Sequence, residues 1–447
     1  MTEQRASLRA ALMPVTALLL GSALLYLGHG LQMTLVPLRA DAEGFSQLTI
    51  GILGATYYAG FVAGCLFVPY LIQRAGHIRA FAAMVSCVSA AALAFPLLIG
   101  EVQWAVFRFM IGACVSGVLV VIESWLNEKS TMHTRGAVMS TYVVISYGAI
   151  TIGQLGVTTQ PLSGFSLFSL CSILLSVAAV PVALTKAAQP APIPKVQFRP
   201  GHLWRLAPAA FVGALASGIM TGSVFSLSAV YAVGSGFSKN EAAVFASALV
   251  LGGALGQYPF GRTSDFVDRR LVLLAAAIAS AALGVFLSLG GILSPTLILL
   301  LGLLLGLVML PSYSLAAAHA YDWTEYEDMV ETSAGMNLLF GVGSTIGPIV
   351  SAVAMQIFGV GGLFLVVAVS SAFLALFIAL RLTRRSRPEE AQRNDFDLYT
   401  TAPVGSAAPD VEILAPEDEN VNVEDLSNEP PEADKEASAV GTEAPPR

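Results

Sequence analysis

The chain has 447 residues, of which 55% are hydrophobic and only 12% are charged. An average soluble domain carries roughly 25% charged residues, so this composition excludes a soluble globular protein, a secreted domain and a fibrous chain. At about 20 residues for each membrane-spanning helix, the apolar content suffices for about twelve spans.

The net charge of −7 conceals an uneven distribution. Residues 388–447 carry 16 acidic and 3 basic side chains, whereas residues 1–387 carry 14 acidic and 20 basic ones. The basic residues are scattered over short loops, so we expect no nucleic-acid partner. All four cysteines lie in apolar runs and are interpreted as packing residues, which predicts no metal site, and we expect no cofactor.

Apolar runs predict an all-α membrane protein with twelve transmembrane helices. Their approximate limits are 12–38, 48–72, 78–99, 102–127, 136–159, 162–184, 208–233, 241–261, 270–292, 295–320, 330–357 and 360–382. Seventeen Lys and Arg residues fall on the side that holds the N-terminus and two, Arg39 and Lys239, on the other. This bias predicts a multi-pass protein of the cell membrane with both termini in the cytoplasm.

A loop rich in proline and positive charge divides the spans into two sets of six. We expect an N-terminal six-helix bundle over 1–185, a cytoplasmic linker over 186–207 and a C-terminal six-helix bundle over 208–385. Residues 386–447 are rich in acidic residues, Pro and Ala and poor in aromatics, which predicts a disordered acidic cytoplasmic tail.

The two sets of spans are internal copies. A shift of 192 residues aligns Gly44-Phe45-Ser46 with Gly236-Phe237-Ser238, and it also superimposes four further glycine pairs. These pairs are Gly21 with Gly213, Gly30 with Gly222, Gly60 with Gly252 and Gly64 with Gly256. An even number of spans in each copy predicts parallel repeats with a substrate site between them.

The loop Gly261-Arg262-Thr263-Ser264-Asp265-Phe266-Val267-Asp268-Arg269-Arg270 resembles the G-x-x-x-D-R-x-G-R-R signature of the major facilitator superfamily of secondary transporters. The first-half copy keeps Arg74, Gly76 and Arg79 but has Pro69 and Gln73 in place of the Gly and the Asp. The resemblance covers residues 10–385, and Glu123-Ser124-Trp125-Leu126-Asn127 is similar to the YcaD-like bacterial branch of the superfamily.

The resemblance implies the major facilitator fold and a loop latch on the cytoplasmic side. The residues expected in this cytoplasmic gate are Arg74, Arg79, Gly261, Asp265, Arg269 and Arg270. Acidic residues between 322 and 331 either pair with Arg74, Arg79 or Arg135 when the gate closes or form a solvated loop.

Ionisable groups inside a membrane are expensive, so Arg108, Glu123 and His29 are functional candidates. Arg108 and Glu123 are 15 residues apart on one span, which places them on similar faces of the helix. By the resemblance, spans 1, 4, 7 and 10 line a central cavity. The residues expected to bind substrate or the coupling ion are therefore Tyr26, His29, Gln32, Arg108, Glu123 and Tyr313.

Each candidate has a chemical role and a structural alternative. Arg108 can hold a carboxylate or anchor the helix at the interface. Glu123 can bind the coupling proton or hydrogen-bond Asn127 in a gate, and His29 can titrate near neutral pH or bridge two helices. Gly60, Gly64, Gly252 and Gly256 predict close helix packing.

No G-x-x-x-x-G-K-[ST] loop is present, so a gradient rather than nucleotide hydrolysis is the expected driving force. The sequence predicts a monomeric secondary transporter that moves a small organic solute by alternating access in the lipid bilayer, with protons as the coupling ion. Two alternatives stay open: a drug or lipophile efflux antiporter, and a transporter-derived sensor or scaffold without flux. A membrane enzyme is not expected, because the short outer loops offer no paired catalytic groups.

Overall fold

The computed structural model describes residues 15–130, 132–184, 199–325 and 328–382. The first half of the chain contains α2 (Thr16–Ala42), α3 (Gln47–Ala75), α4 (His77–Ala94), α5 (Glu101–Glu128), α6 (Met132–Leu155) and α7 (Ser166–Ala183). The second half contains α9 (Pro208–Gly234), α10 (Lys239–Phe266), α11 (Arg269–Ser288), α12 (Pro295–Met309), α13 (Pro311–Tyr321), α14 (Met329–Phe358) and α15 (Gly362–Leu382). The described residues also form three short helices: η2 (Gly156–Thr159), α8 (Pro200–Leu206) and η3 (Gly290–Ile292).

Within these ranges, 12 helical segments are long and apolar enough to cross a membrane, with α12 and α13 forming one span. The predicted number of spans is therefore confirmed. Several limits differ from the prediction by a few residues, such as the end of the eighth span at Phe266 rather than 261. The third span ends at Ala94 rather than 99, because Pro96 has no N–H to continue the helix. The tenth span is interrupted at Leu310, because Pro311 has no N–H to continue the helix.

The predicted repeat is visible in the helix boundaries. Helices α2, α3 and α4 begin at Thr16, Gln47 and His77, and α9, α10 and α11 begin 192 residues later. The packing repeats as well: α2 contacts α6 and α7 as α9 contacts α14 and α15, and α3 contacts α5 as α10 contacts α12.

The matching Gly-Phe-Ser loops have a structural reason. Gly44 and Gly236 both adopt positive φ, at 81° and 93°, a conformation that glycine tolerates best. Ser46 and Ser238 then cap the next helix, each accepting a hydrogen bond from a backbone N–H of the first turn. Both functions depend on residue type, so the same three residues serve at equivalent turns.

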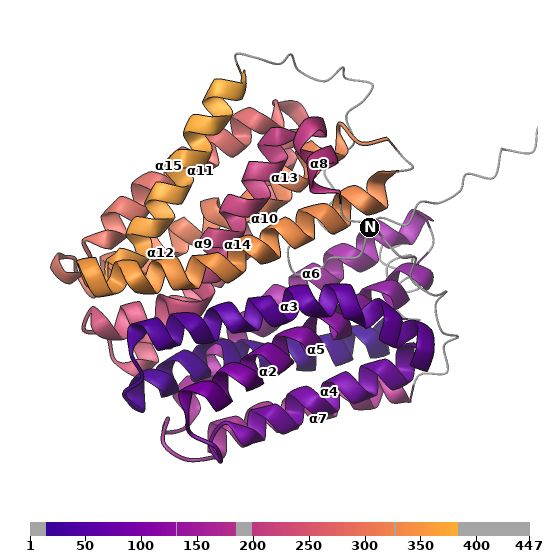
Figure 1. Ribbon diagram of the computed structural model, residues 1–447, viewed down its shortest axis with the longest axis vertical. Coiled ribbons are helices and arrows are strands. Elements are labelled where there is room, and N and C mark those ends of the chain that lie inside the picture. The colour runs from indigo at the N-terminus through magenta and orange to yellow at the C-terminus, as the bar shows by residue number, and fades with distance from the viewer. Residues whose placement is uncertain (1–14, 131, 185–198, 326–327, 383–447) are drawn as a thin grey trace, which may run out of the picture. The chain divides into compact units, whose positions relative to one another are not determined.

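We call the end at which α2 begins and α15 ends the terminal side, and the other end the opposite side. Helix α3 runs beside α14, and α6 contacts α10, so these helices join the two halves (Figure 1). Near the opposite side, Gly51 lies against Pro348 and Ala352 of α14, and Gly54 lies against Ser226 of α9. These contacts bring the two halves together at the opposite side.

Several predicted segments lie outside the described residues. They are the start of the first span at 12–14, the linker residues 186–198 and the acidic tail 386–447. The rest of the predicted linker contains the short helix α8.

Candidate functional site

Three buried polar side chains from three helices form what we call the Glu123 cluster: Tyr26 of α2, Glu123 of α5 and Tyr142 of α6. The Tyr142 hydroxyl donates a hydrogen bond to Glu123 Oε1 at 3.3 Å, and the hydroxyls of Tyr26 and Tyr142 are 2.7 Å apart. Because a tyrosine has one hydroxyl proton, Tyr142 accepts from Tyr26 while it donates to Glu123. The cluster is therefore a chain of two hydrogen bonds, from Tyr26 to Tyr142 and from Tyr142 to the fully buried carboxylate of Glu123.

A second group, the Arg108 cluster, contains His29 of α2, Tyr57 of α3 and Arg108 of α5. The Tyr57 hydroxyl lies 3.2 Å from His29 Nε2, and the guanidinium carbon of Arg108 lies 4.5 Å from the centre of the Tyr57 ring. Tyr57 thus lies between His29 and Arg108, two of the predicted substrate residues.

Arg108 is 4% exposed, and its polar contacts are few. Its Nε donates to the Leu53 carbonyl at 3.3 Å, while one terminal nitrogen has no hydrogen-bond partner in the described part of the chain. No described carboxylate forms an ion pair with it. A buried guanidinium held by a carbonyl and an aromatic ring is only partly compensated for its lost hydration.

A central cavity of about 70 Å³ lies where four helices of the first half meet α9 and α14. One water needs about 10–15 Å³ of such space, so the cavity holds several waters or a small part of a solute. Its polar lining is formed by Tyr26, His29, Tyr57, Tyr58 and Thr221, and its apolar lining includes Phe61, Phe225 and Phe340. Both clusters therefore contribute side chains to one cavity between the halves.

The other two predicted substrate residues lie apart from these clusters. Gln32 is buried, and neither atom of its amide has a hydrogen-bond partner among the described residues. Tyr313 donates to Asn337 at 2.6 Å and packs edge-on against Phe340, a cavity residue of the second half.

Two predicted gate residues of the second half, Arg269 and Arg270, form buried ion pairs. Arg269 lies 3.1 Å from Asp322, and each side chain is 3% exposed. Arg270 donates to both oxygens of Asp268, at 3.2 and 2.8 Å. Burial alone would raise the pKa of Asp268, but the hydrogen bonds from Arg270, together with the positive charges of Arg270 and His319, hold this pKa below its ordinary value.

The other predicted gate residues differ in exposure. Gly261 is buried, and Asp265 lies 3.9 Å from Arg262, one helical turn earlier. Arg74 and Arg79 of the first half are exposed. Asp322 contacts Arg269 of the second half, and Glu331 contacts Arg199, which lies just before α8, whereas the Arg135 side chain and Glu327 lie outside the described residues.

The four predicted packing glycines lie at equivalent helix contacts. Gly60 and Gly64 lie against the backbone of α5 at Phe109 and Ala113. Gly252 and Gly256 lie against α12 at Leu303 and Leu307. A β-carbon at any of the four would clash with a backbone carbonyl oxygen.

Sequence reasoning singled out neither Tyr57 nor Tyr142 as a site residue. Neither tyrosine has a charged neighbour in the sequence that would have identified it as part of a functional site. The adjacent tyrosines Tyr57 and Tyr58 in an otherwise apolar span were the available signal, because a tyrosine hydroxyl inside a membrane needs a hydrogen-bond partner.

A family model described as the Major Facilitator Superfamily matches residues 18–250 and 209–412. Among curated proteins, the "Uncharacterized MFS-type transporter YcaD" of Shigella flexneri and that of Escherichia coli (strain K12 / DH10B) are each 29% identical over 370 residues. The match covers 82% of this chain and 95% of either relative.

Solved structures with the same fold have low sequence identity. The nucleoside transporter NupG has a TM-score of 0.65 at 13% identity and covers 83% of this chain and 100% of its own. A bacterial homologue of the human lysosomal transporter Spinster, inward-facing and occupied, has a TM-score of 0.64 at 15% identity and covers 85% and 97%. FucP in its outward conformation has a TM-score of 0.55 at 14% identity and covers 83% and 99%. These likenesses confirm the fold and leave the substrate to be argued from the site.

Proposed function

Because the chain belongs to the major facilitator superfamily of membrane transporters, we propose that it is a secondary active transporter that couples a small organic anion to protons. The premise is the family match over residues 18–250 and 209–412. The specific observation is the buried guanidinium of Arg108, which has no carboxylate partner among the described residues.

Arg108 is the proposed anion contact. A charged side chain inside a membrane helix is energetically costly. An anionic solute would supply the missing counter-charge and accept from the unpartnered nitrogen. Tyr57 shields Arg108 from the central cavity, so we infer that this ring moves when the solute binds.

Glu123 is the proposed proton carrier. Its carboxylate is fully buried, so its hydrogen-bond partners decide which protonation state is stable. Tyr142 and Tyr26 stabilise the deprotonated form by donating in sequence toward it. We infer that such a carboxyl can bind and release a proton during a transport cycle.

Alternating access requires contacts that part when the halves rock. The glycine contacts of α3 with α14 and α9 near the opposite side are proposed as one such closed seam. The Gln257 amide of α10 donates to Tyr147 of α6 at 3.2 Å, a further bond between halves that opening would break. The Lys and Arg bias supports placing the terminal side in the cytoplasm of a bacterial inner membrane.

A second candidate is efflux of an apolar cation or neutral drug. It is favoured by the phenylalanine rings that line the central cavity, since they suit an apolar solute. The two candidates differ in their dependence on Arg108, which an anion requires and a neutral lipophile does not.

The test is proton flux in liposomes that contain an internal pH dye. Pools of organic acids, amines, sugars and drugs are added to wild type, Arg108→Ala and Glu123→Gln. Glu101→Gln is the matched control, because Glu101 is an exposed acid on the same helix. We expect the organic-acid pool to move protons in wild type and in the control, and neither variant to do so.

Counterflow exchange of the active acid separates the two roles. Glu123→Gln should retain exchange, because exchange needs no net proton movement, whereas Arg108→Ala should lose it through weaker binding. Proton flux by Glu123→Gln at the wild-type rate would contradict the coupling role. A response confined to the drug pool, with Arg108→Ala unaffected, would favour the second candidate.

A further inference from the structure

We propose that a cavity on the terminal side of the second half binds the headgroup phosphate of an anionic phospholipid. The cavity has a volume of about 210 Å³ and shares no lining residue with the central cavity. Its side chains come from α8, the start of α9, α11, α13, the loop after α13 and α15. The charged and aromatic ones are Trp204, Arg205, Arg270, His319, Trp323 and Arg381.

The lining carries positive charge and no carboxylate. Arg270 is neutralised by Asp268, but Arg205 and Arg381 form no ion pair with any described carboxylate. Arg205 donates from Nε to the Gly201 carbonyl at 3.2 Å, and Arg381 lies over the rings of Trp204 and Phe377 at 5.8 and 5.4 Å. Both guanidiniums therefore keep donors for an anion.

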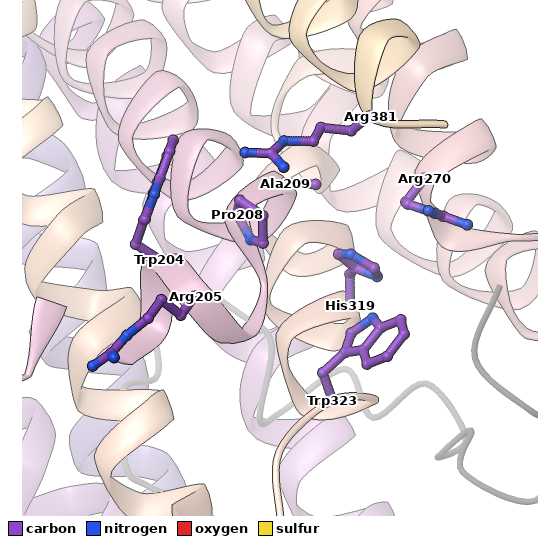
Figure 2. A pocket seen from close by; sticks show the side chains of 8 residues that line it. All are labelled: Trp204, Arg205, Pro208, Ala209, Arg270, His319, Trp323 and Arg381. Carbon is purple, nitrogen blue, oxygen red and sulfur yellow. The ribbon is translucent and has the colours of Figure 1, made fainter. Parts of the chain in front are cut away.

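Figure 2 shows how these side chains are arranged. Arg381 extends toward Trp204 above Pro208 and Ala209, His319 and Trp323 lie below them, and Arg205 extends away from Arg381 toward the lower left. Proline has no backbone N–H, so Pro208 offers an anion no hydrogen bond from the backbone. The donors and the positive charge of the cavity come from the side chains.

The position of the cavity favours a lipid over a soluble anion. Arg381 is the penultimate residue of the span Gly362–Leu382, and the surface leading away from it along α15 is apolar and exposed. Phe373, Leu376 and Leu380 are 58%, 60% and 55% exposed there, as expected for side chains facing acyl chains. Tryptophan and arginine at the end of a span suit the headgroup level of a bilayer.

A lipid in this position would connect the linker to the transport domain. Its phosphate would contact α8, which precedes the second half, and α15, which ends it. Bound lipid would therefore hold Trp204 and Arg381 together on the terminal side of the second half.

The experiment titrates delipidated full-length protein with dioleoyl-phosphatidylglycerol or dioleoyl-phosphatidylcholine and counts bound lipids by native mass spectrometry. We expect one phosphatidylglycerol bound in preference to phosphatidylcholine. The double variant Arg205→Gln with Arg381→Gln should reduce that preference roughly tenfold, since two arginines near an anionic headgroup are removed. The matched control is Arg199→Gln with Arg262→Gln, two exposed arginines that do not line the cavity, one just before α8 and one in α10, and it should keep the preference.

Three results would overturn the proposal. One is an equal loss of preference in the control, which would indicate a diffuse effect of charge. A second is displacement of phosphatidylglycerol by inorganic phosphate at the same concentration, which would indicate a soluble-anion site. A third is displacement by a peptide of residues 388–447, which would assign the cavity to the chain's own acidic segment.

Discussion

The two halves of the chain share their packing but not their chemistry. In the first half, Gly112 of α5 lies against the Tyr57 carbonyl of α3, and in the second, Gly306 of α12 lies against the Leu249 carbonyl of α10. Gly153 and Gly347 likewise lie against Leu27 and Ile219. These paired contacts align the two halves position by position from their backbone packing alone.

Counting from those glycines identifies the position in the second half that is equivalent to each functional residue of the first half. Arg108, four residues before Gly112, corresponds to Gly302, and Glu123, eleven residues after it, corresponds to Ala317. The remaining members of the two clusters have apolar, small or uncharged equivalents in the second half. Tyr26 corresponds to Gly218, His29 to Thr221, Tyr57 to Leu249 and Tyr142 to Met336.

The difference between the two halves shows that a duplicated membrane fold can place its energetically costly charged side chains in one repeat only. At about 2.5–3.5 kcal/mol for each charged side chain in the membrane, a second copy of both clusters would double a destabilising term. Both clusters draw all their members from the first half, so the hydrogen bonds within them survive a rocking of one half against the other. The second half offers the cavity an uncharged wall that includes Thr221, Phe225 and Phe340.

The largest expected effect comes from breaking the shared packing. Gly112→Val and Gly306→Val should each leave little or no folded protein, because the new β-carbon would meet a backbone oxygen that no rotamer change can move. Fluorescence-detected size-exclusion chromatography measures the folded fraction. Gly148→Val is the control, since open space surrounds Gly148. Tolerance at one site but not the other would show that the two seams are not equivalent.

A smaller effect is expected from removing one hydroxyl of the Glu123 cluster. Tyr142→Phe deletes the donor to Glu123 and separates Tyr26 from it. A lost hydrogen bond to a charged group corresponds to about 1.5–3 kcal/mol, so the proton-flux rate should change by roughly 10- to 100-fold. Met336→Leu, the equivalent position in the second half, conserves volume and should change it little. An equal effect of both substitutions would mean that the chemistry is not confined to one half.

The smallest effect concerns the loops before α4 and α11. Asp268 binds Arg270 in the second half, whereas the first half has Gly76 and Ile78 at these positions. Since the pKa of Asp268 is lowered by folding, its contribution is present above the unfolded-state value near 3.9 and is lost as pH falls through the lower folded value. Burial raises the pKa of Asp268 while the hydrogen bonds from Arg270 lower it, so the two effects partly cancel and the net contribution is modest.

Thermal unfolding of wild type and Asp268→Asn from pH 7 down to pH 3 measures that contribution. Wild type should be more stable at neutral pH, and the gap should narrow only in the acid range. A gap that stays constant down to pH 3 would show that the Asp268–Arg270 pair does not titrate with folding.

Much of the architecture could be predicted from the sequence. Twelve spans and the repeat follow from hydrophobicity and from glycine and serine positions, because both report local requirements of a helix or a turn. The grouping of site residues was less accessible. The 15-residue spacing placed Arg108 and Glu123 on one face of α5, but their partners Tyr57 and Tyr142 come from α3 and α6.

Twelve membrane spans with few ionisable groups inside them are legible in the chain's residue order. The length and apolar content of its runs give the spans, and the energetic penalty on buried charge marks the few ionisable groups. The folded arrangement was needed to show that Tyr142 links Tyr26 to Glu123, and that Tyr57 lies between His29 and Arg108. It also decided that Asp322 pairs with Arg269 of its own half. The reason is that each contact joins side chains of separate helical elements, whose rotation and depth are set by glycine contacts with neighbouring backbones and not by any local pattern.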